Sequence, residues 1–222
     1  MNHFFAHRRQ SVDLNAVESF IRRASMITNL TEPEEDPSIV FAFRAGDAFT
    51  NTSRLILLHG GQKCRLQNLD KEALKELKEK ENLQMNDMSF NASTVAYLID
   101  GDVKVTQDIA IFRYLARKYN LVAQSEEMIQ QQDTFEGLIA NLNLTSLSAT
   151  ADPQEIRHAS EKVKAVLERL DQWLVGRNYL LGDQLNYTDF MLLEVLNTWF
   201  LDLLPHFLQL KSFCARMQQV TL

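Results

Sequence analysis

Residues 97–120 read Tyr-Leu-Ile-Asp-Gly-Asp-Val-Lys-Val-Thr-Gln-Asp-Ile-Ala-Ile-Phe-Arg-Tyr-Leu-Ala-Arg-Lys-Tyr-Asn, and the spacing of their apolar residues changes partway along. The first half alternates around Asp100-Gly101, a pair that readily supplies the positive φ angles of a two-residue hairpin turn. From Gln107 onward the apolar residues have helical spacing. The residues expected on the inner stripe of this helix are Ile109, Phe112, Leu115 and Ala116. The segment therefore predicts a strand, a turn, a second strand and a helix that opens at Gln107-Asp108.

The residues before this segment predict a repeated strand–helix order. Residues 38–43 read as a first strand. A helix is expected from about Thr52 to Gly60-Gly61, because glycine accepts the left-handed geometry of a helix C-cap. A second strand at 63–69 and a charged helix at 71–82 follow. Together with the hairpin and its helix, this order predicts an α/β domain over residues 38–120.

After Tyr119 the sequence predicts only helices. Residues 126–141 and 153–175 carry apolar residues at helical spacing. Asp152-Pro153 opens the second of these helices, since aspartate is a good N-cap and proline suits the first helical turn. A very apolar helix follows residues 182–190. We therefore expect an all-α domain over residues 121–222.

The composition restricts the classes of function. The formal net charge of −6 argues against a general nucleic-acid surface, which would need a basic face. No apolar run approaches the roughly 20 residues that span a bilayer, so we expect no membrane span. Cys64 and Cys214 lie far apart without the spacing of metal ligands, and the histidines are dispersed. We expect no metal site and two reduced cysteines in packing roles.

Residues 1–37 form an extension before the first predicted strand. Arg8 and Arg9 occur early in it, with no acidic residue before Asp13. Such composition is typical of a mitochondrial presequence, but the acidic run at 32–36 argues against one. The prolines around that run favour a linker. We expect an appended helix, an acidic linker and a cytoplasmic protein, with a mitochondrial presequence as the alternative.

The chain after this extension resembles the cytosolic glutathione transferases, most closely the mu class. The strand–turn–strand–helix of residues 97–120 matches the end of that family's thioredoxin-like domain. Residues 182–190, Gly-Asp-Gln-Leu-Asn-Tyr-Thr-Asp-Phe, resemble the family's Gly-Asp and Thr/Ser-X-X-Asp pattern at the start of a buried helix. Asn186 then stands at the cap and Asp189 at the third helical position, which predicts a structural capping box. The resemblance implies a thioredoxin-like domain followed by a helical bundle domain.

The resemblance also implies where catalytic groups would lie. Glutathione transferases act by lowering the pKa of the glutathione thiol, because the thiolate is the nucleophile. In the mu class, a tyrosine at the end of the first strand donates a hydrogen bond from its hydroxyl to this sulfur. That tyrosine lies eleven residues before an arginine. Counting back from Arg54 places Phe43 at that position, which keeps the ring and loses the hydroxyl. In the serine-type classes the hydroxyl lies nearer the arginine, so Thr50 is the candidate substitute.

Other positions correspond to contacts with glutathione itself. The family has a cis-proline before its third strand, and Ala96 stands there in this chain. We therefore expect a trans peptide and altered hydrogen bonds between the Val95 backbone and glutathione. Gln107 matches a glutamine that holds the γ-glutamyl end. Asp108 replaces a serine, and we expect its carboxylate to cap the helix and repel the substrate's α-carboxylate. Arg44 completes the set of expected glutathione contacts.

These substitutions support a main hypothesis and two alternatives. The main hypothesis is a glutathione-transferase-like homodimer with weak or lost conjugation, which acts as a binding or scaffold protein for hydrophobic small molecules or other partners. One alternative is an active transferase that uses glutathione against hydrophobic electrophiles, with Thr50 or a water activating the thiol. Another is a protein-interaction module of a translation-type complex, with residues 1–37 as its docking element. Glutathione is the only cofactor that the resemblance implies.

Overall fold

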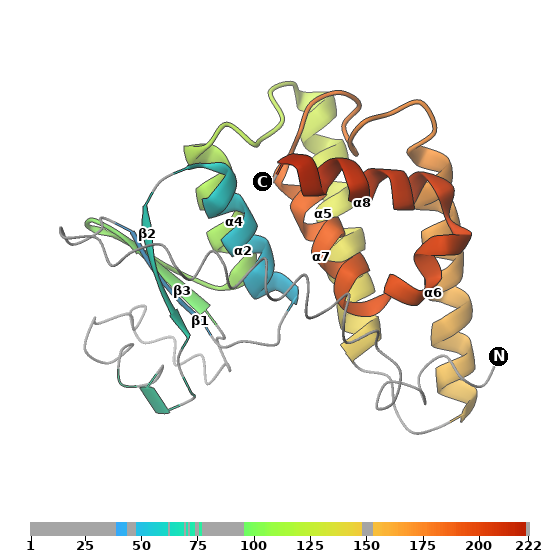
Figure 1. The fold of residues 1–222 in the computed structure, drawn as a ribbon, viewed down its shortest axis with the longest axis horizontal. Coiled ribbons are helices and arrows are strands. Elements are labelled where there is room, and N and C mark those ends of the chain that lie inside the picture. The colour runs from blue at the N-terminus through green and yellow to red at the C-terminus, as the bar shows by residue number, and fades with distance from the viewer. Residues whose placement is uncertain are drawn as a thin grey trace.

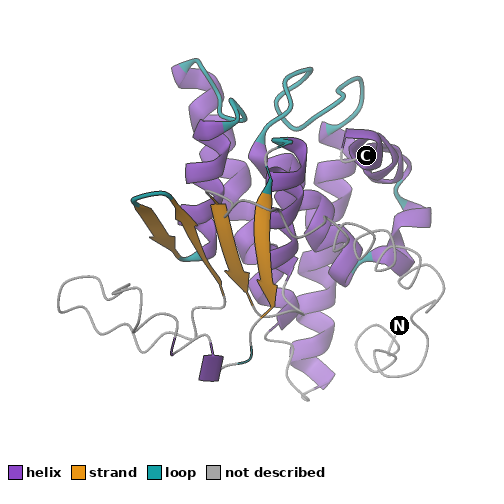
Figure 2. Ribbon diagram, turned by 60° about the vertical axis from the view of Figure 1, so that its left-hand side comes forward, coloured by secondary structure: helices purple, strands orange, loops and turns teal. Residues whose placement is uncertain are grey.

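The computed structural model describes residues 39–43, 48–61, 63–68, 70, 72–73, 76, 96–147 and 153–220. A sheet lies at one side of the molecule, helices α2 and α4 cover one of its faces, and a group of longer helices packs beyond them (Figure 1). The same order is visible after rotation, with the long helices on one side of the strands (Figure 2). The expected α/β domain followed by a helical domain is confirmed.

The sheet has four strands in the order β2-β1-β3-β4. Strand β1 (Ile39–Phe43) is central and pairs in parallel with β2 (Cys64–Asn68). Its other neighbour, β3 (Ala96–Asp100), is antiparallel and continues through a hairpin into β4 (Val103–Thr106). A strand between two others is shielded on both edges, and Ile39, Phe41 and Ala42 of β1 are fully buried.

Two predicted boundaries in this domain are corrected. Asp100 pairs with Val103, so the hairpin loop is Gly101-Asp102, one residue later than expected, with Gly101 at φ +58°. Helix α2 (Ala48–His59) begins four residues before the expected Thr52. Tertiary packing explains the early start, because the Phe49 ring meets the Phe112 ring edge-on at 5.5 Å. The helix ends at Gly60-Gly61 as predicted, with Gly61 at φ +64°.

Helix α4 (Asp108–Lys118) follows the hairpin and belongs to the sheet domain. The helical domain consists of α5 (Glu126–Leu147), α6 (Pro153–Trp173), α7 (Tyr187–Trp199), a 3-10 turn (Leu201–His206) and α8 (Leu208–Val220). Helix α5 extends beyond the predicted end at 141, because Leu142 and Ser146 are buried and Trp199 Nε1 donates to Asn143 Oδ1 at 2.6 Å. Helix α6 ends before the predicted Val175. Helix α7 is the most deeply buried, with every residue from 187 to 196 inaccessible.

The first turn of α7 carries the predicted capping box. The Asn186 side chain accepts from the Thr188 backbone N–H at 3.1 Å, and Asp189 Oδ2 accepts from the Asn186 backbone N–H at 2.8 Å. Asp189 Oδ1 also accepts from the Leu180 backbone N–H at 2.8 Å. Because this helix end has no access to water, these side chains satisfy donors that would otherwise be unpaired.

Several predictions fall outside the described residues. They are the extension at 1–37, most of the charged helix at 71–82, Asp152 as a cap, Arg44 and the Val95–Ala96 peptide. Within the described residues, no helix has both the length and the apolar character needed to cross a bilayer. Cys64 and Cys214 are both free thiols.

Asp189 offers a direct test of the capping box. We expect Asp189→Ala to lower the free energy of unfolding by about 2–5 kcal/mol, because two buried backbone N–H groups lose their acceptor. Urea unfolding followed by tryptophan fluorescence measures the change. The control is Asp133→Ala on the exposed face of α5, which we expect to change stability by less than about 0.5 kcal/mol. Equal stability of the two variants would contradict the structural role.

Candidate functional site

Four of the predicted site residues gather at one end of the sheet. Phe43 is the last residue of β1 and pairs with Ala96, the first residue of β3. Tyr97 pairs with Thr106, the last residue of β4, so Gln107 and Asp108 follow at the same end. The expected contacts Arg44 and Val95 lie outside the described residues. The strand register therefore brings together positions that lie more than sixty residues apart in the sequence.

The Phe43 side chain is packed into the protein rather than open to solvent, with an exposed fraction of only 6%. Its ring stacks on Phe41 with centroids 5.4 Å apart, as expected for residues two apart on one strand face. The Arg54 guanidinium lies over the ring, 5.5 Å from its centroid, a cation–π distance. Burial lowers the pKa of Arg54, and the charge of Glu194 opposes that shift. Phe43 therefore supplies an aromatic wall beside a positive charge but no hydrogen-bond donor.

Gln107 has an unusual backbone at the end of β4. Its φ is 75° and its ψ is 126°, a combination that side-chain-bearing residues rarely adopt. Such a conformation costs free energy and persists only where the surrounding structure imposes it, most often at functional sites. The Gln107 side chain is exposed and makes no capping bond to the helix, while its carbonyl accepts from the Ile111 N–H at 2.9 Å. The side chain is therefore presented outward from a strained position.

Asp108 differs from the expectation that it caps helix α4. Gln107 occupies the cap position, and Asp108 is the first helical residue. The reason is the strained turn at Gln107, which moves the helix start by one residue. A carboxylate in the first turn still stabilises the helix through its dipole. Its negative charge still lies where the N-terminus of α4 would attract an anion.

Thr50, the candidate substitute for the missing hydroxyl, is buried in helix α2. Its exposed fraction is 1%, and its Oγ1 has no hydrogen-bond partner within the described part of the chain. A buried hydroxyl without a partner is uncommon, because it loses its bonds to water without replacement. The Ser53 Oγ, one turn later, is in the same condition.

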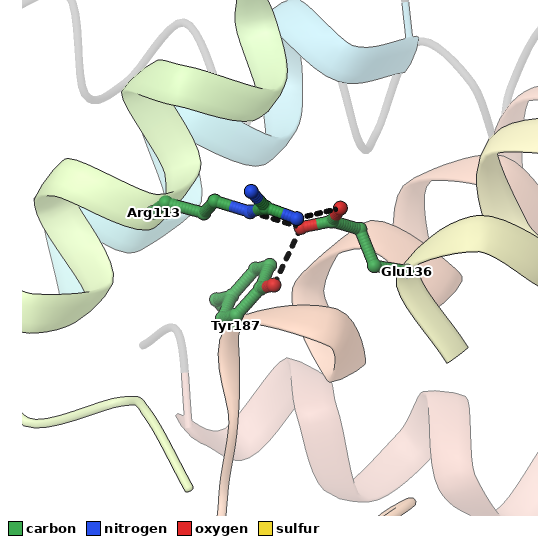
Figure 3. Close-up of polar contacts among 3 residues, drawn as sticks. All are labelled: Arg113, Glu136 and Tyr187. Atoms are coloured by element: carbon green, nitrogen blue, oxygen red, sulfur yellow. Dashed lines mark hydrogen bonds and ion pairs between the residues drawn. The ribbon is translucent and has the colours of Figure 1, made fainter. Parts of the chain in front are cut away.

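A network that was not predicted joins the two domains (Figure 3). Arg113 on α4 binds Glu136 on α5 through two parallel bonds, Nε to Oε2 at 2.8 Å and Nη2 to Oε1 at 2.6 Å. The Tyr187 hydroxyl donates to Glu136 Oε2 at 2.6 Å. Burial raises the pKa of Tyr187, and the bond to Glu136 raises it further. These residues are separated by up to 74 positions, so no local sequence signal could reveal the network.

Among the described residues, no group of three histidine, cysteine, aspartate or glutamate side chains could hold a metal ion. Burial also raises the pKa of both cysteines to about 12, so neither thiol in this part of the chain is a ready nucleophile at neutral pH. The chemical groups that remain at the end of the sheet are an aromatic ring, a guanidinium, an amide and a carboxylate.

The ion pair between Arg113 and Glu136 predicts a measurable loss of stability when Arg113 is substituted. We expect Arg113→Met to lower the free energy of unfolding by about 1–3 kcal/mol, because a two-bond ion pair to a nearly buried carboxylate is removed. Arg117→Met, on the exposed face of the same helix, is the matched control and should change it by less than about 0.5 kcal/mol. Chemical denaturation of both variants gives the comparison. An Arg113 effect no larger than the control's would show that the pair contributes little.

Comparisons with known proteins place this arrangement in a family. The model of the glutathione S-transferase C-terminal domain matches residues 110–219. Glutathione S-transferase Mu 3 of Mus musculus is 32% identical over 148 residues, which cover 64% of this chain and 66% of the relative. Glutathione S-transferase 2 of Gallus gallus is 34% identical over 113 residues, 50% of this chain and 51% of the relative. The chain thus spans between one half and two thirds of the length of these relatives.

Solved structures agree on the fold. The Pi-class glutathione S-transferase of Onchocerca volvulus superposes with a TM-score of 0.66 at 24% identity, over 82% of this chain and 88% of that one. The glutathione S-transferase of Ascaris lumbricoides gives a TM-score of 0.65 at 20% identity, over 83% of this chain and 93% of that one. With its four-stranded sheet, its helical domain and its mu-class relatives, the chain belongs to the glutathione transferase family and is mu-like.

Proposed function

We propose that this protein is a glutathione-transferase-like binding or scaffold protein with weak or lost conjugating activity. The observation that carries the proposal is Phe43, which lies at the end of β1 where the family's resemblance expects a tyrosine hydroxyl. A thiol becomes a good nucleophile only when its thiolate is stabilised. The Phe43 ring offers no donor for that purpose, and its burial against Phe41 leaves little of the ring accessible.

Asp108 supports the same proposal through electrostatics. The N-terminus of α4 would attract the carboxylate of a γ-glutamyl group, as helix N-termini attract anions. Asp108 adds a negative charge to the first turn of that helix. Two carboxylates a few ångströms apart repel each other, so glutathione would bind more weakly than at a neutral residue.

An active transferase remains the second candidate because of Gln107 and Thr50. The strained backbone of Gln107 presents an exposed amide side chain at the position that matches the family's γ-glutamyl contact. The Thr50 hydroxyl has no partner in the described part of the chain, so it is available to a sulfur if the helix start shifts. In this reading Thr50 would take the place of the missing phenol, and hydrophobic electrophiles would be the second substrates.

The decisive experiment is glutathione binding by calorimetry, combined with conjugation to an activated aryl chloride. We expect the unaltered chain to give no heat at millimolar glutathione and a conjugation rate near background. Phe43→Tyr with Asp108→Ser should restore binding and raise the rate by at least about tenfold, because a donor is added and a repulsive charge removed. Asp102→Ser, in the exposed hairpin loop, is the control for loss of one acidic residue.

Robust conjugation by the unaltered chain would overturn the proposal. Thr50→Ala would then test whether the threonine hydroxyl activates the thiol, with loss of rate at unchanged glutathione affinity as the expected sign. If the double variant also fails to bind, the block lies at Ala96, where the family's cis-proline is missing. In that outcome the protein acts through partners or hydrophobic ligands rather than through glutathione.

We also propose that the protein is a cytoplasmic homodimer. Its exposed surface supports the homodimer through charge complementarity: α4 carries the exposed Arg117, and the start of α5 carries the exposed Glu126 and Glu127. A two-fold axis can bring such patches from two copies together. Sedimentation equilibrium should give a particle of twice 25.6 kDa, and Arg117→Glu should shift the equilibrium toward the monomer. A mass of 25.6 kDa at every concentration would refute the dimer.

A further inference from the structure

An ionisable side chain, Glu194, is enclosed where the two domains meet. It lies in the middle of α7, with an exposed fraction of 1%. Helix α2 of the sheet domain packs directly against α7 and presents Asn51 and Arg54 to this region. Carboxylates are almost never fully buried unless they are paired, so a fully buried glutamate at a domain boundary needs a physical explanation.

The surroundings of Glu194 stabilise its charge only in part. The Asn51 and Asn197 side chains and the positive charge of Arg54 favour the ionised form. The Oε1 atom nevertheless has no hydrogen-bond partner within the described residues. The Arg54 guanidinium lies over the Phe43 ring, 5.5 Å from its centroid, and its Nη1 donates to Asn51 Oδ1 at 3.3 Å. The closed interface therefore accommodates the neutral acid better than the carboxylate.

We infer that Glu194 is a proton-linked clasp between the two domains. While the proton is bound, the α2–α7 interface stays closed. Loss of the proton leaves a buried, incompletely paired charge, which opening of the interface returns to water. Arg54 connects the clasp to the candidate site, since its charge interacts with Glu194 while its guanidinium lies over the Phe43 ring.

The direction of the pH dependence follows from burial. Burial raises the pKa of Glu194 from 4.5 to about 7 in the closed protein, and opening restores the ordinary value. Opening therefore releases a proton, so it becomes easier as pH rises from about 4.5 to about 7 and levels off above that. One released proton corresponds to a change of about tenfold per pH unit in the opening equilibrium.

The other titratable groups near α7 do not produce the pH dependence expected of Glu194. From α8, Cys214 faces Glu194, but burial raises the pKa of this thiol to about 12, so it carries no charge near neutral pH. From the end of α2, His59 contacts the Phe190 ring, with centroids 5.6 Å apart. Asp189 is also buried, but its bonds to Leu180 and Asn186 lie within the helical domain. Its proton therefore affects unfolding of that domain rather than separation of the two domains.

The test is amide hydrogen exchange of the full chain between about pH 5 and pH 8.5, corrected for the intrinsic pH dependence of exchange. We compare the unaltered chain with Glu194→Gln, which keeps the size and removes the titration. Glu168→Gln on α6, with a side chain 57% exposed, is the control. Protection of α2 and α7 should fall by up to about tenfold per pH unit below pH 7 in the unaltered chain and the control. In Glu194→Gln that slope should be reduced, with greater protection retained above pH 7.

Equal slopes in the unaltered chain and Glu194→Gln would overturn the inference. Should Glu194→Gln fail to fold, carboxyl carbon NMR of the unaltered chain decides the matter alone. A buried glutamate carboxyl that titrates near neutral pH supports the clasp, and titration of every glutamate near 4.5 refutes it. The clasp concerns the domain interface, so both measurements are independent of whether glutathione binds.

Discussion

Helix α7 of the helical domain packs against α2 of the sheet domain, and burial of its N-terminus is the constraint on which the arrangement depends. A helix end cannot be placed in a protein interior unless its free backbone N–H groups find acceptors. Asn186 and Asp189 provide those acceptors and also bind the preceding loop at Leu180. The helix can then present its apolar sides to α2 and α5 at once. Without the capping box, the first turn of this apolar helix would have to face water so that its backbone N–H groups could form hydrogen bonds.

The interface organised by α7 is held by polar groups as well as by apolar packing. Arg113, Glu136 and Tyr187 join α4, α5 and the start of α7 at one place. Glu194 and Arg54 lie farther along the same interface. The first group is fully paired, whereas Glu194 is not. Paired networks define one relative placement of two domains, and an incompletely paired carboxyl makes that placement sensitive to protons.

The candidate site lies at the end of the sheet and inherits its geometry from these contacts. Phe43 touches Arg54, which faces the domain interface, and Gln107 begins the helix that carries Arg113. The end of the sheet therefore combines a strained turn at Gln107 with an aromatic ring at Phe43. Under the proposed function, the missing hydroxyl at Phe43 lowers reactivity without disturbing packing, because the ring supplies the contacts with Phe41 and Arg54. Binding without catalysis is consistent with such a change.

Local sequence signals were sufficient for the elements and for the motifs that act within a few residues. Alternation and helical spacing predicted the strands and helices, and the spacing of Asn186 and Asp189 predicted the capping box, because each involves contacts between near neighbours in the chain. Boundaries were less predictable: Phe49 packs on Phe112, and this contact extends α2 beyond its propensity. Three features could be identified only in the tertiary structure. They are the strained backbone at Gln107, the Arg113–Glu136–Tyr187 network and the burial of Glu194. Each depends on groups from separate elements meeting in a water-poor interior, where a charge or a backbone conformation acquires a cost that it does not have in the isolated segment.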